Sequence, residues 1–147
     1  MKRTASAQWR GDLKSGSGTV STASGVLSNS PYSFRTRFEE AKGTNPEELL
    51  AAAHAGCFTM AVSAQLAQAN LTAESLETTC TITLEKQADG FAITESRLDL
   101  KARVPGATQE AFDKAVEAAK TGCPVSKLYK TNITLTAQLI GEAAQHA

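Results

Sequence analysis

The sequence has no surplus of charge of either sign. Its 15 Lys and Arg residues balance 15 Asp and Glu residues, so the formal net charge is zero. Proteins that bind nucleic acid or anionic membranes need clustered Lys and Arg, because phosphate contacts supply much of the affinity. No such cluster occurs here, and we expect neither a nucleic-acid partner nor a membrane partner.

An apolar leader is also missing from the start of the sequence. Residues 1–6 include Lys2 and Arg3, and polar positions and Trp9 follow them. A secretory signal peptide would place an apolar core in this region. We therefore expect a cytoplasmic protein.

Cysteine is scarce. The 3 cysteines are Cys57, Cys80 and Cys123. An odd, small number without an export signal argues against the disulfide framework that holds small secreted domains together. In a reducing cytosol most cysteines are ordinary core residues, so a chemical role must come from the local surroundings.

Charged residues are absent from a long central stretch, residues 49–73. Its length would suit a membrane span, but it contains polar side chains whose transfer into lipid is unfavourable. These are His54, Thr59, Ser63, Gln65, Gln68 and Asn70. We expect a helix buried inside a soluble protein instead.

The start of this helix has clear signals. Asn45 is suited to the N-cap, Pro46 to the first helical position, and Glu48 to the third, where it completes a capping-box-like pattern. The helix should end near Asn70.

The other patterns predict short strands in the N-terminal third, and a mixture of strands and helices after the central helix. The expected strands are residues 4–9, 18–22, 32–38, 76–85, 95–104 and 133–140, with a turn at 88–90, a helix from the cap Thr108 to Gly122, and a short helix after Cys123. This order argues for an α+β fold. Without a long linker or internal repeat, we assign one domain to residues 1–141 and a C-terminal tail to 142–147.

Cys57 lies in the middle of the charge-free helix, where burial would raise the pKa of its thiol and suppress its reactivity. A nucleophilic role needs a cation from another part of the chain. The candidate is Arg37, because Arg35 and Arg37 alternate on the same side of an apolar-flanked predicted strand, so that one or both could point inward. Glu47 is the candidate partner for that arginine. The plain alternatives are a solvated arginine and a carboxylate that only favours the first helical turn.

The other two cysteines differ in their surroundings. Cys123 directly precedes Pro124 at a predicted helix start, where backbone N–H groups would lower the pKa of a thiol at the N-cap. Cys80 belongs to the apolar face of its predicted strand, and we expect it to be a core residue.

His54 precedes Cys57 by three residues and shares its helical face. Such a pair suggests a cysteine hydrolase, and His-x-x-Cys could begin a metal site. No orienting residue or further ligand is apparent, since the remaining histidine is His146 near the C-terminus. A structural histidine is the simpler interpretation.

Two motifs resemble those of the OsmC/Ohr family, the osmotically inducible protein C and organic hydroperoxide resistance proteins. Residues 44–58, TNPEELLAAAHAGCF, resemble the family's first-cysteine motif, and residues 119–126, AKTGCPVS, resemble its second. Residues 34–46 are closest to the OsmC branch. The resemblance implies an OsmC-like α+β fold with β-sheets around two central helices, in which two chains interlock into a homodimer with active sites at the subunit interface.

The resemblance also implies the site residues. Cys57 takes the position of the peroxidatic cysteine, Cys123 that of the resolving cysteine, and Glu47 that of the family's glutamate. Arg37 takes the position of the arginine, with Arg35 as the second choice. Cys80 matches no family motif.

The implied activity is that of a thiol-dependent peroxidase in oxidative or osmotic stress defence. It would reduce organic hydroperoxides, and hydrogen peroxide more weakly, through a Cys57 sulfenic acid and a Cys57–Cys123 disulfide. No metal, haem or flavin cofactor is implied, because an external dithiol of the dihydrolipoamide type, free or on a lipoylated protein, reopens the disulfide. We expect the substrate to meet apolar walls formed by Phe34, Phe38, Phe58 and Met60.

Two rival functions stay open at this point. One is a redox-sensing module that uses the same disulfide as a signal, and the other is a cysteine hydrolase that uses Cys57 and His54.

Helix geometry adds a prediction about the site. Glu47 and Cys57 are ten residues apart, which is about 15 Å along a straight helix. We therefore expect Arg37 and Glu47 of one subunit to meet Cys57 of the other. A kinked helix, or an Arg37 that reaches Cys57 while Glu47 only steadies its own helix end, are the alternatives.

Overall fold

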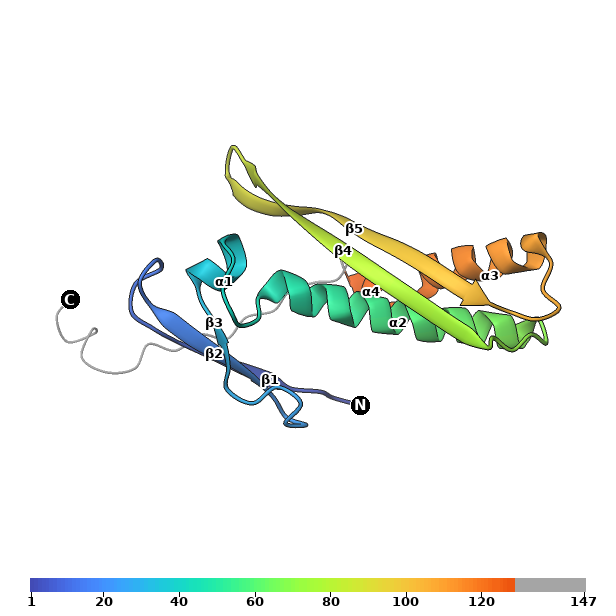
Figure 1. Cartoon of the computed structure of the whole chain (residues 1–147), viewed down its shortest axis with the longest axis horizontal. Coiled ribbons are helices and arrows are strands. Elements are labelled where there is room, and N and C mark those ends of the chain that lie inside the picture. Colours follow the sequence, from blue (N-terminus) through green and yellow to red (C-terminus); the bar gives the residue numbers. More distant parts are fainter. Residues whose placement is uncertain (129–147) are drawn as a thin grey trace.

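A computed structural model describes residues 1–128 (Figure 1). The predicted strand at 133–140 and the tail at 142–147 lie outside the described residues. The elements are β1 (Ala5–Arg10), β2 (Ser17–Thr22), β3 (Ser30–Tyr32), α1 (Phe34–Phe38), α2 (Pro46–Gln68), β4 (Ser75–Gln87), β5 (Gly90–Arg103), α3 (Gln109–Gly122) and α4 (Pro124–Leu128). This mixture of helices and antiparallel sheets confirms the predicted α+β class.

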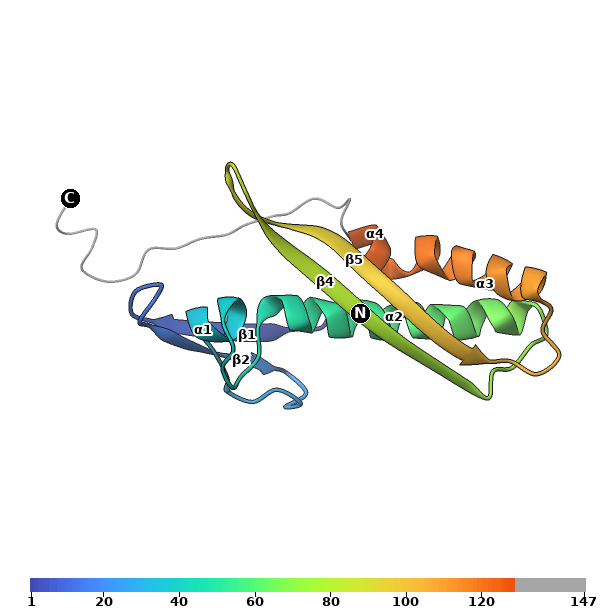
Figure 2. The same ribbon diagram turned by 45° about the horizontal axis from the view of Figure 1, so that its top comes forward.

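The strands form two separate antiparallel sheets. Strands β1, β2 and β3 are neighbours in one sheet, and β4 and β5 form a long hairpin. The hairpin runs from the pair Ser75–Arg103 to the pair Gln87–Gly90, where Gly90 has a φ of 126° that other residues rarely adopt. The turn predicted at 88–90 is therefore confirmed. Figures 1 and 2 show the hairpin lying across α2 and α3, with the three-stranded sheet near the start of α2.

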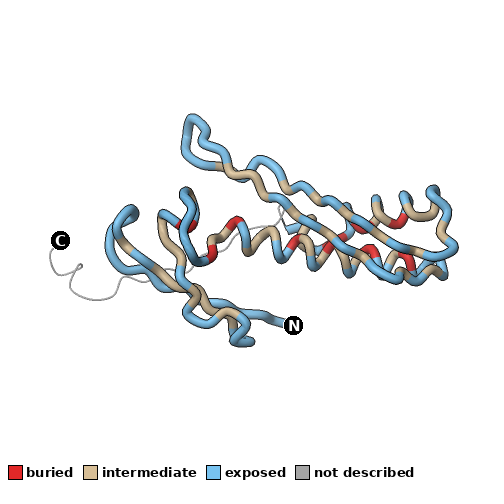
Figure 3. The backbone as a smooth tube through the Cα atoms, viewed as in Figure 1, coloured by how far each residue is buried: buried red, intermediate tan, exposed pale blue. Residues whose placement is uncertain are grey.

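The core lies between α2, α3 and the hairpin. Its helical residues recur every four positions, as expected for one face of a helix. The buried residues are Phe58, Val62 and Leu66 on α2, Ala115 and Ala119 on α3, and Cys123. Half-buried Leu76, Leu98 and Leu100 of the hairpin pack against them. Figure 3 shows the buried positions of α2 and α3 concentrated where the two helices lie side by side.

The side of α2 that faces away from this core is exposed to solvent in the described chain. The helix is long and apolar enough to cross a membrane by length and composition, a property shared with core helices of soluble proteins, and only 22% of its most apolar window is buried by described residues. Ala52, Ala53, Gly56 and Met60 are exposed. The sequence predicted a helix buried inside a soluble protein. Within residues 1–128 only one side of it is covered, because one hairpin and one helix cannot surround it.

Residues 34–38 contradict the predicted strand, which extends only to Tyr32 and is followed by the short helix α1. Ser33 caps this helix: its Oγ accepts the Thr36 N–H at 3.2 Å, and Thr36 Oγ1 accepts the Ser33 N–H at 2.8 Å. This reciprocal capping box favours a helical turn. The alternation of side chains that suggested a strand is therefore coincidental.

The predicted start of α2 is confirmed with one change. Asn45 is the N-cap, and its Oδ1 accepts the Glu48 N–H at 2.8 Å, with Pro46 in the first turn. The Glu48 carboxylate, however, accepts a hydrogen bond from the Thr44 hydroxyl at 2.8 Å. Asn45 Nδ2 also donates to the Thr36 carbonyl at 3.0 Å, which ties α1 to the start of α2.

Replacement of the cap should destabilise the protein. Asn45→Ala loses both the cap acceptor and the bond to Thr36, and we expect the free energy of unfolding to fall by about 1 to 2 kcal/mol. Asn45→Asp keeps the acceptor and serves as the matched control, with a smaller loss. Urea denaturation measures both, and an unchanged unfolding free energy in Asn45→Ala would contradict the assigned cap.

Candidate active site

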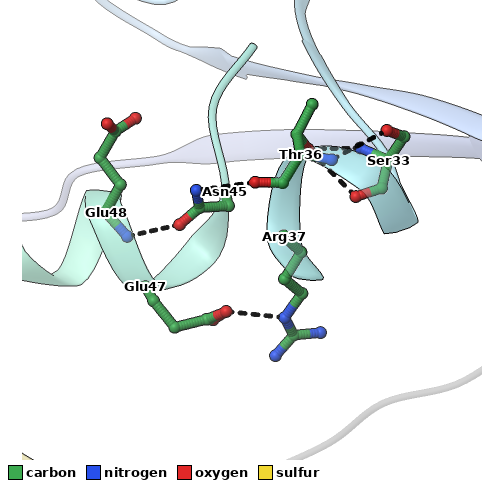
Figure 4. Close-up of polar contacts among 6 residues, drawn as sticks. All are labelled: Ser33, Thr36, Arg37, Asn45, Glu47 and Glu48. Carbon is green, nitrogen blue, oxygen red and sulfur yellow. Dashed lines mark hydrogen bonds and ion pairs between the residues drawn. The ribbon is translucent and has the colours of Figure 1, made fainter. Parts of the chain in front are cut away.

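Arg37 and Glu47 form an ion pair at the start of α2. Arg37 Nε donates to Glu47 Oε1 at 2.8 Å (Figure 4), and the side chains are 39% and 11% exposed. Such charge-assisted bonds are stronger than neutral ones, particularly where one partner is shielded from water. Arg35 instead pairs with Glu39, and both of those side chains are more than half exposed. The structure thus gives Glu47 to Arg37, as predicted, and not to Arg35.

The guanidinium of Arg37 has N–H donors that the bond to Glu47 does not use. Glu47 engages Nε, which leaves the two terminal amino groups outside that contact (Figure 4). The Arg37 side chain also lines a mainly apolar cavity of about 260 Å³, here called the aromatic cavity. Its other lining residues are Trp9, Leu13, Tyr32, Ser33, Phe34 and Phe38. Two of the four predicted wall residues, Phe34 and Phe38, therefore do line a cavity beside the arginine.

The other two predicted wall residues are elsewhere. Phe58 is 2% exposed because it fills the core between the helices. Met60 is 77% exposed on the bare side of α2. Neither lines the aromatic cavity, since both are carried more than two helical turns beyond the start of α2.

Cys57 and Cys123 are in direct contact. Their sulfur atoms are 2.8 Å apart, Cys57 is half-buried, and Cys123 is 0% exposed. The Cys123 N–H bonds to the Ala119 carbonyl at the end of α3, while its own carbonyl accepts the Lys127 N–H at 3.2 Å. Cys123 therefore stands at the junction of α3 and α4, the position predicted from Pro124.

The two thiols differ in their tendency to ionise. Burial raises the pKa of Cys57, and the neighbouring Cys123 raises it further. Burial opposes ionisation of Cys123 as well, but hydrogen bonds from Cys57, Ser126 and Val125 outweigh it, so the pKa of Cys123 falls. No cation of the described chain contributes to the pKa of Cys57. Within one chain the first negative charge thus belongs on Cys123, and Cys57 still lacks the cation that its predicted role requires.

Within the single chain, the Arg37–Glu47 ion pair lies far from the Cys57–Cys123 pair. Helix α2 is continuous over its 23 residues, so Glu47 and Cys57 are separated by about 15 Å along its axis. Figure 1 shows α1 at the beginning of α2 and α4 beside its middle. Helix α2 has no kink that would bring Arg37 to Cys57. The Arg37 side chain is also too short to span this distance while it is bonded to Glu47.

His54 is buried, at 5% exposure, and both ring nitrogens face serine hydroxyls. Nδ1 is 2.6 Å from Ser96 Oγ on β5, and Nε2 is 2.9 Å from Ser126 Oγ on α4. Burial lowers the pKa of His54, so its ring is neutral at neutral pH. An imidazole engaged in this way is poorly placed to serve as the base of a cysteine hydrolase. In residues 1–128, moreover, His, Cys, Asp and Glu do not gather in threes that could hold a metal ion.

Sequence reasoning missed Ser96 and Ser126. They lie 42 and 72 residues after His54, and no local motif marks Ser96. The only available signal was for Ser126, which occupies the third helical position after the predicted cap Cys123.

Cys80 departs from the expected core position. It is half-buried and outside the core cluster, with its sulfur 3.3 Å from Ser96 Oγ. The physical reason is that Cys80 lies beside the polar pair of Ser96 and His54, whereas its cross-strand partner Leu98 packs against the core.

Loss of the Cys80 thiol should have little effect on turnover. We expect Cys80→Ala to keep near-normal peroxidase activity and to lose less than about 1 kcal/mol of stability. Steady-state peroxide consumption and urea denaturation measure the two quantities, with Cys80→Ser as a control that retains a polar group. A disulfide to Cys80 in the peroxide-treated wild-type protein would refute this expectation.

Comparison with known proteins shows which family the chain resembles. Residues 39–138 match the family described as OsmC-like protein. The chain is 53% identical over 133 residues to the peroxiredoxin OsmC of Escherichia coli strain K12, covering 90% of this chain and 93% of the relative.

Solved structures show the same fold. The organic hydroperoxide resistance protein OhrB of Bacillus subtilis has a TM-score of 0.63 and 27% identity, covering 88% of this chain and 92% of that chain. An OsmC-like protein of Vibrio cholerae has a TM-score of 0.68 at 17% identity, covering 87% and 93%, which is a likeness of fold alone. With its two motif cysteines in contact, the chain belongs to the OsmC-like protein family and is a cysteine-based peroxidase.

Proposed function

We propose that this peroxidase reduces organic hydroperoxides to alcohols, with Cys57 as the attacking thiolate and Cys123 as the resolving thiol. The observation that carries the proposal is the 2.8 Å contact between the two sulfurs. The Cys57 thiolate attacks one peroxide oxygen, the O–O bond breaks, and the alkoxide leaves and takes up a proton. Cys57 is then a sulfenic acid, and the adjacent Cys123 converts it to a disulfide before further oxidation.

The cation for Cys57 comes, in this proposal, from a second copy of the chain. If two α2 helices pack antiparallel about a two-fold axis near Ala52, midway between Glu47 and Cys57, the Arg37–Glu47 pair of each chain lies level with the cysteine of the other. The exposed positions Ala52, Ala53 and Gly56 are small enough for close approach. A Cβ built on Gly56 meets no atom within 4 Å in the described chain, so the space beside it suits another backbone.

This arrangement gives Arg37 a defined task. Its terminal amino groups would stabilise the Cys57 thiolate and the charge that develops on the peroxide oxygens. Glu47, held by Nε, would fix the orientation of the guanidinium. A shared site would let the half-buried Cys57 thiol, whose pKa is raised in one chain, act as a nucleophile in a homodimer.

The aromatic cavity beside Arg37 supports a preference for organic substrates. Its lining is mainly aromatic, and burial of an alkyl or aryl group there contributes roughly 25 cal/mol for each Å² of apolar surface removed from water. Hydrogen peroxide has no such group. The Bacillus subtilis protein of the same fold is named for organic hydroperoxide resistance, which agrees with this preference.

The disulfide requires an external dithiol to reopen it. We propose a dithiol of the dihydrolipoamide type, free or carried by a lipoylated protein, because its second thiol releases the mixed disulfide by closing a ring. A cycle that must return to free thiols suits a reducing compartment, and we place the protein in the cytoplasm on that ground.

A peroxide-consumption assay tests the proposal. Cumene hydroperoxide, tert-butyl hydroperoxide and hydrogen peroxide are compared with dihydrolipoamide as reductant. We expect kcat/KM to be highest for the organic peroxides. A single oxidation without turnover would instead favour the redox sensor, and equal kcat/KM values for all three peroxides would remove the assigned preference.

A further inference from the structure

A line of hydrogen-bonding side chains leads across the fold to the resolving cysteine. Cys80 Sγ is 3.3 Å from Ser96 Oγ, which is 2.6 Å from His54 Nδ1. On the other side of the ring, His54 Nε2 is 2.9 Å from Ser126 Oγ. Ser126 follows Cys123 by three residues, the position from which a side chain reaches back to a helix cap, and its hydroxyl and backbone N–H both lower the pKa of Cys123.

The direction of each bond follows from the number of protons available. A serine hydroxyl donates once, so if Ser126 donates to the Cys123 sulfur, its oxygen accepts from His54 Nε2–H. The buried His54 is neutral and has a single N–H, which makes Nδ1 an acceptor for the Ser96 hydroxyl. Ser96 Oγ can then accept the Cys80 S–H. Every group donates in the same direction, toward Cys123.

We propose that His54 is a positioning residue for the resolving step. Its bond to Ser126 directs the serine hydroxyl proton at the Cys123 thiolate while Cys57 is a sulfenic acid. This inference rests on the function proposed for the two cysteines. In the step, an electron pair of the Cys123 thiolate forms the S–S bond, the S–O bond of Cys57 breaks, and hydroxide leaves and takes up a proton to become water. The His54–Ser126 pair stabilises the thiolate that starts this step.

The charged side chains near Cys123 are exposed to water, so their effect on its thiolate is weak compared with that of a direct hydrogen bond. The cavity beside Ser126 is lined by His54 on α2, Lys120 on α3, and Ser96 and Leu98 on β5. The other charged side chains of α3 and β5 are exposed. Lys120 Nζ lies 3.6 Å from Glu117 Oε1 and its side chain is 63% exposed, so water screens its charge. Lys127 is exposed as well.

The test separates oxidation of Cys57 from closure of the disulfide in a single turnover. Wild type, Ser126→Ala and His54→Leu are mixed with one equivalent of cumene hydroperoxide, quenched at intervals, and the sulfenic acid and disulfide are measured by mass spectrometry. Ser126→Thr retains the hydroxyl, and Thr121→Val removes an exposed hydroxyl close to Cys123 that bonds to Glu117 O. These two serve as controls.

We expect all variants to oxidise Cys57 at the wild-type rate. Closure should slow about tenfold in Ser126→Ala and His54→Leu, the loss typical of one hydrogen bond to a charged group, and stay normal in both controls. Should His54→Leu fail to fold, Ser126→Ala decides alone. Normal closure in Ser126→Ala overturns the inference.

A second measurement excludes a purely structural effect. In a Cys57→Ser/Cys80→Ser background, the pH midpoint for the ultraviolet absorbance of the Cys123 thiolate should rise by about one unit in Ser126→Ala and stay fixed in Thr121→Val. Slowed closure with an unmoved midpoint overturns the inference, because the serine would then act through packing alone. A wild-type protein that forms no sulfenic acid at Cys57 refutes the proposed function instead.

Discussion

Chains with Cys57→Ser and chains with Arg37→Met, each inactive alone, regain peroxidase activity when they are refolded together. In a shared site, a mixed dimer has one site with both lesions and one intact site. Random pairing makes half of the dimers mixed, and half of their sites are intact, so the expected recovery is about a quarter of wild-type activity. The homodimers should each fall by about a hundredfold or more, since one loses the nucleophile and the other the main stabilising charge.

The structural basis is the distance between the two halves of the site. Arg37 is fixed at the start of α2 by Glu47, at 2.8 Å, while Cys57 is three helical turns further along the same unbroken helix. The pKa of Cys57 is raised by burial, with no contribution from a cation of its own described chain. Within residues 1–128 of a single chain, Cys57 therefore has no cation that would stabilise its thiolate.

A reciprocal mixture provides the matched control. Wild-type chains refolded with the double variant Cys57→Ser/Arg37→Met form mixed dimers in which a shared site is never intact, whereas a site built within one chain would survive in the wild-type half. The expected activity is about a quarter of wild type for the shared site and about a half for the single-chain site. Heterodimers that form but regain no activity in the first mixture would rule the shared site out.

Peroxide-treated Cys123→Ser should accumulate a sulfenic acid at Cys57 and lose catalytic turnover. The sulfurs of Cys57 and Cys123 are 2.8 Å apart, so in the wild type the sulfenic acid meets its partner without rearrangement of the backbone. Without the second thiol, the oxidised sulfur persists and becomes open to overoxidation. Labelling with dimedone followed by peptide mapping identifies the modified residue.

The wild-type protein is the control for this experiment. One equivalent of peroxide should give a single disulfide between Cys57 and Cys123, with Cys80 free, and dihydrolipoamide should reverse it. Cys57→Ser should form neither product. Dimedone on Cys123 of the Cys57→Ser variant would mean that the roles of the two cysteines are exchanged. Dimedone on Cys80 of the Cys123→Ser variant, in place of Cys57, would exclude the mechanism.

Local chemistry made several elements predictable from the sequence. The start of α2 was recognised because Asn45 and Pro46 act on the backbone within one turn. The hairpin was recognised from alternating side chains and the turn at Gly90. The same kind of pattern failed at residues 34–38. The placing of Arg35 and Arg37 on one side of an apolar-flanked segment is compatible with a strand, but the bond between Ser33 and Thr36 favours a helix.

The sequence by itself determined the family, the two motif cysteines and the ends of the main helices, because motifs and caps depend on residues close together in the chain. Only the tertiary structure decided which arginine meets Glu47, that Phe58 fills the core, and that His54 joins Ser96 to Ser126. These contacts join separate elements, and their formation depends on how α2, the hairpin and α4 pack around one another. The bare side of α2 and the separation of Arg37 from Cys57 likewise follow from packing, since a straight helix holds residues ten positions apart at a fixed distance.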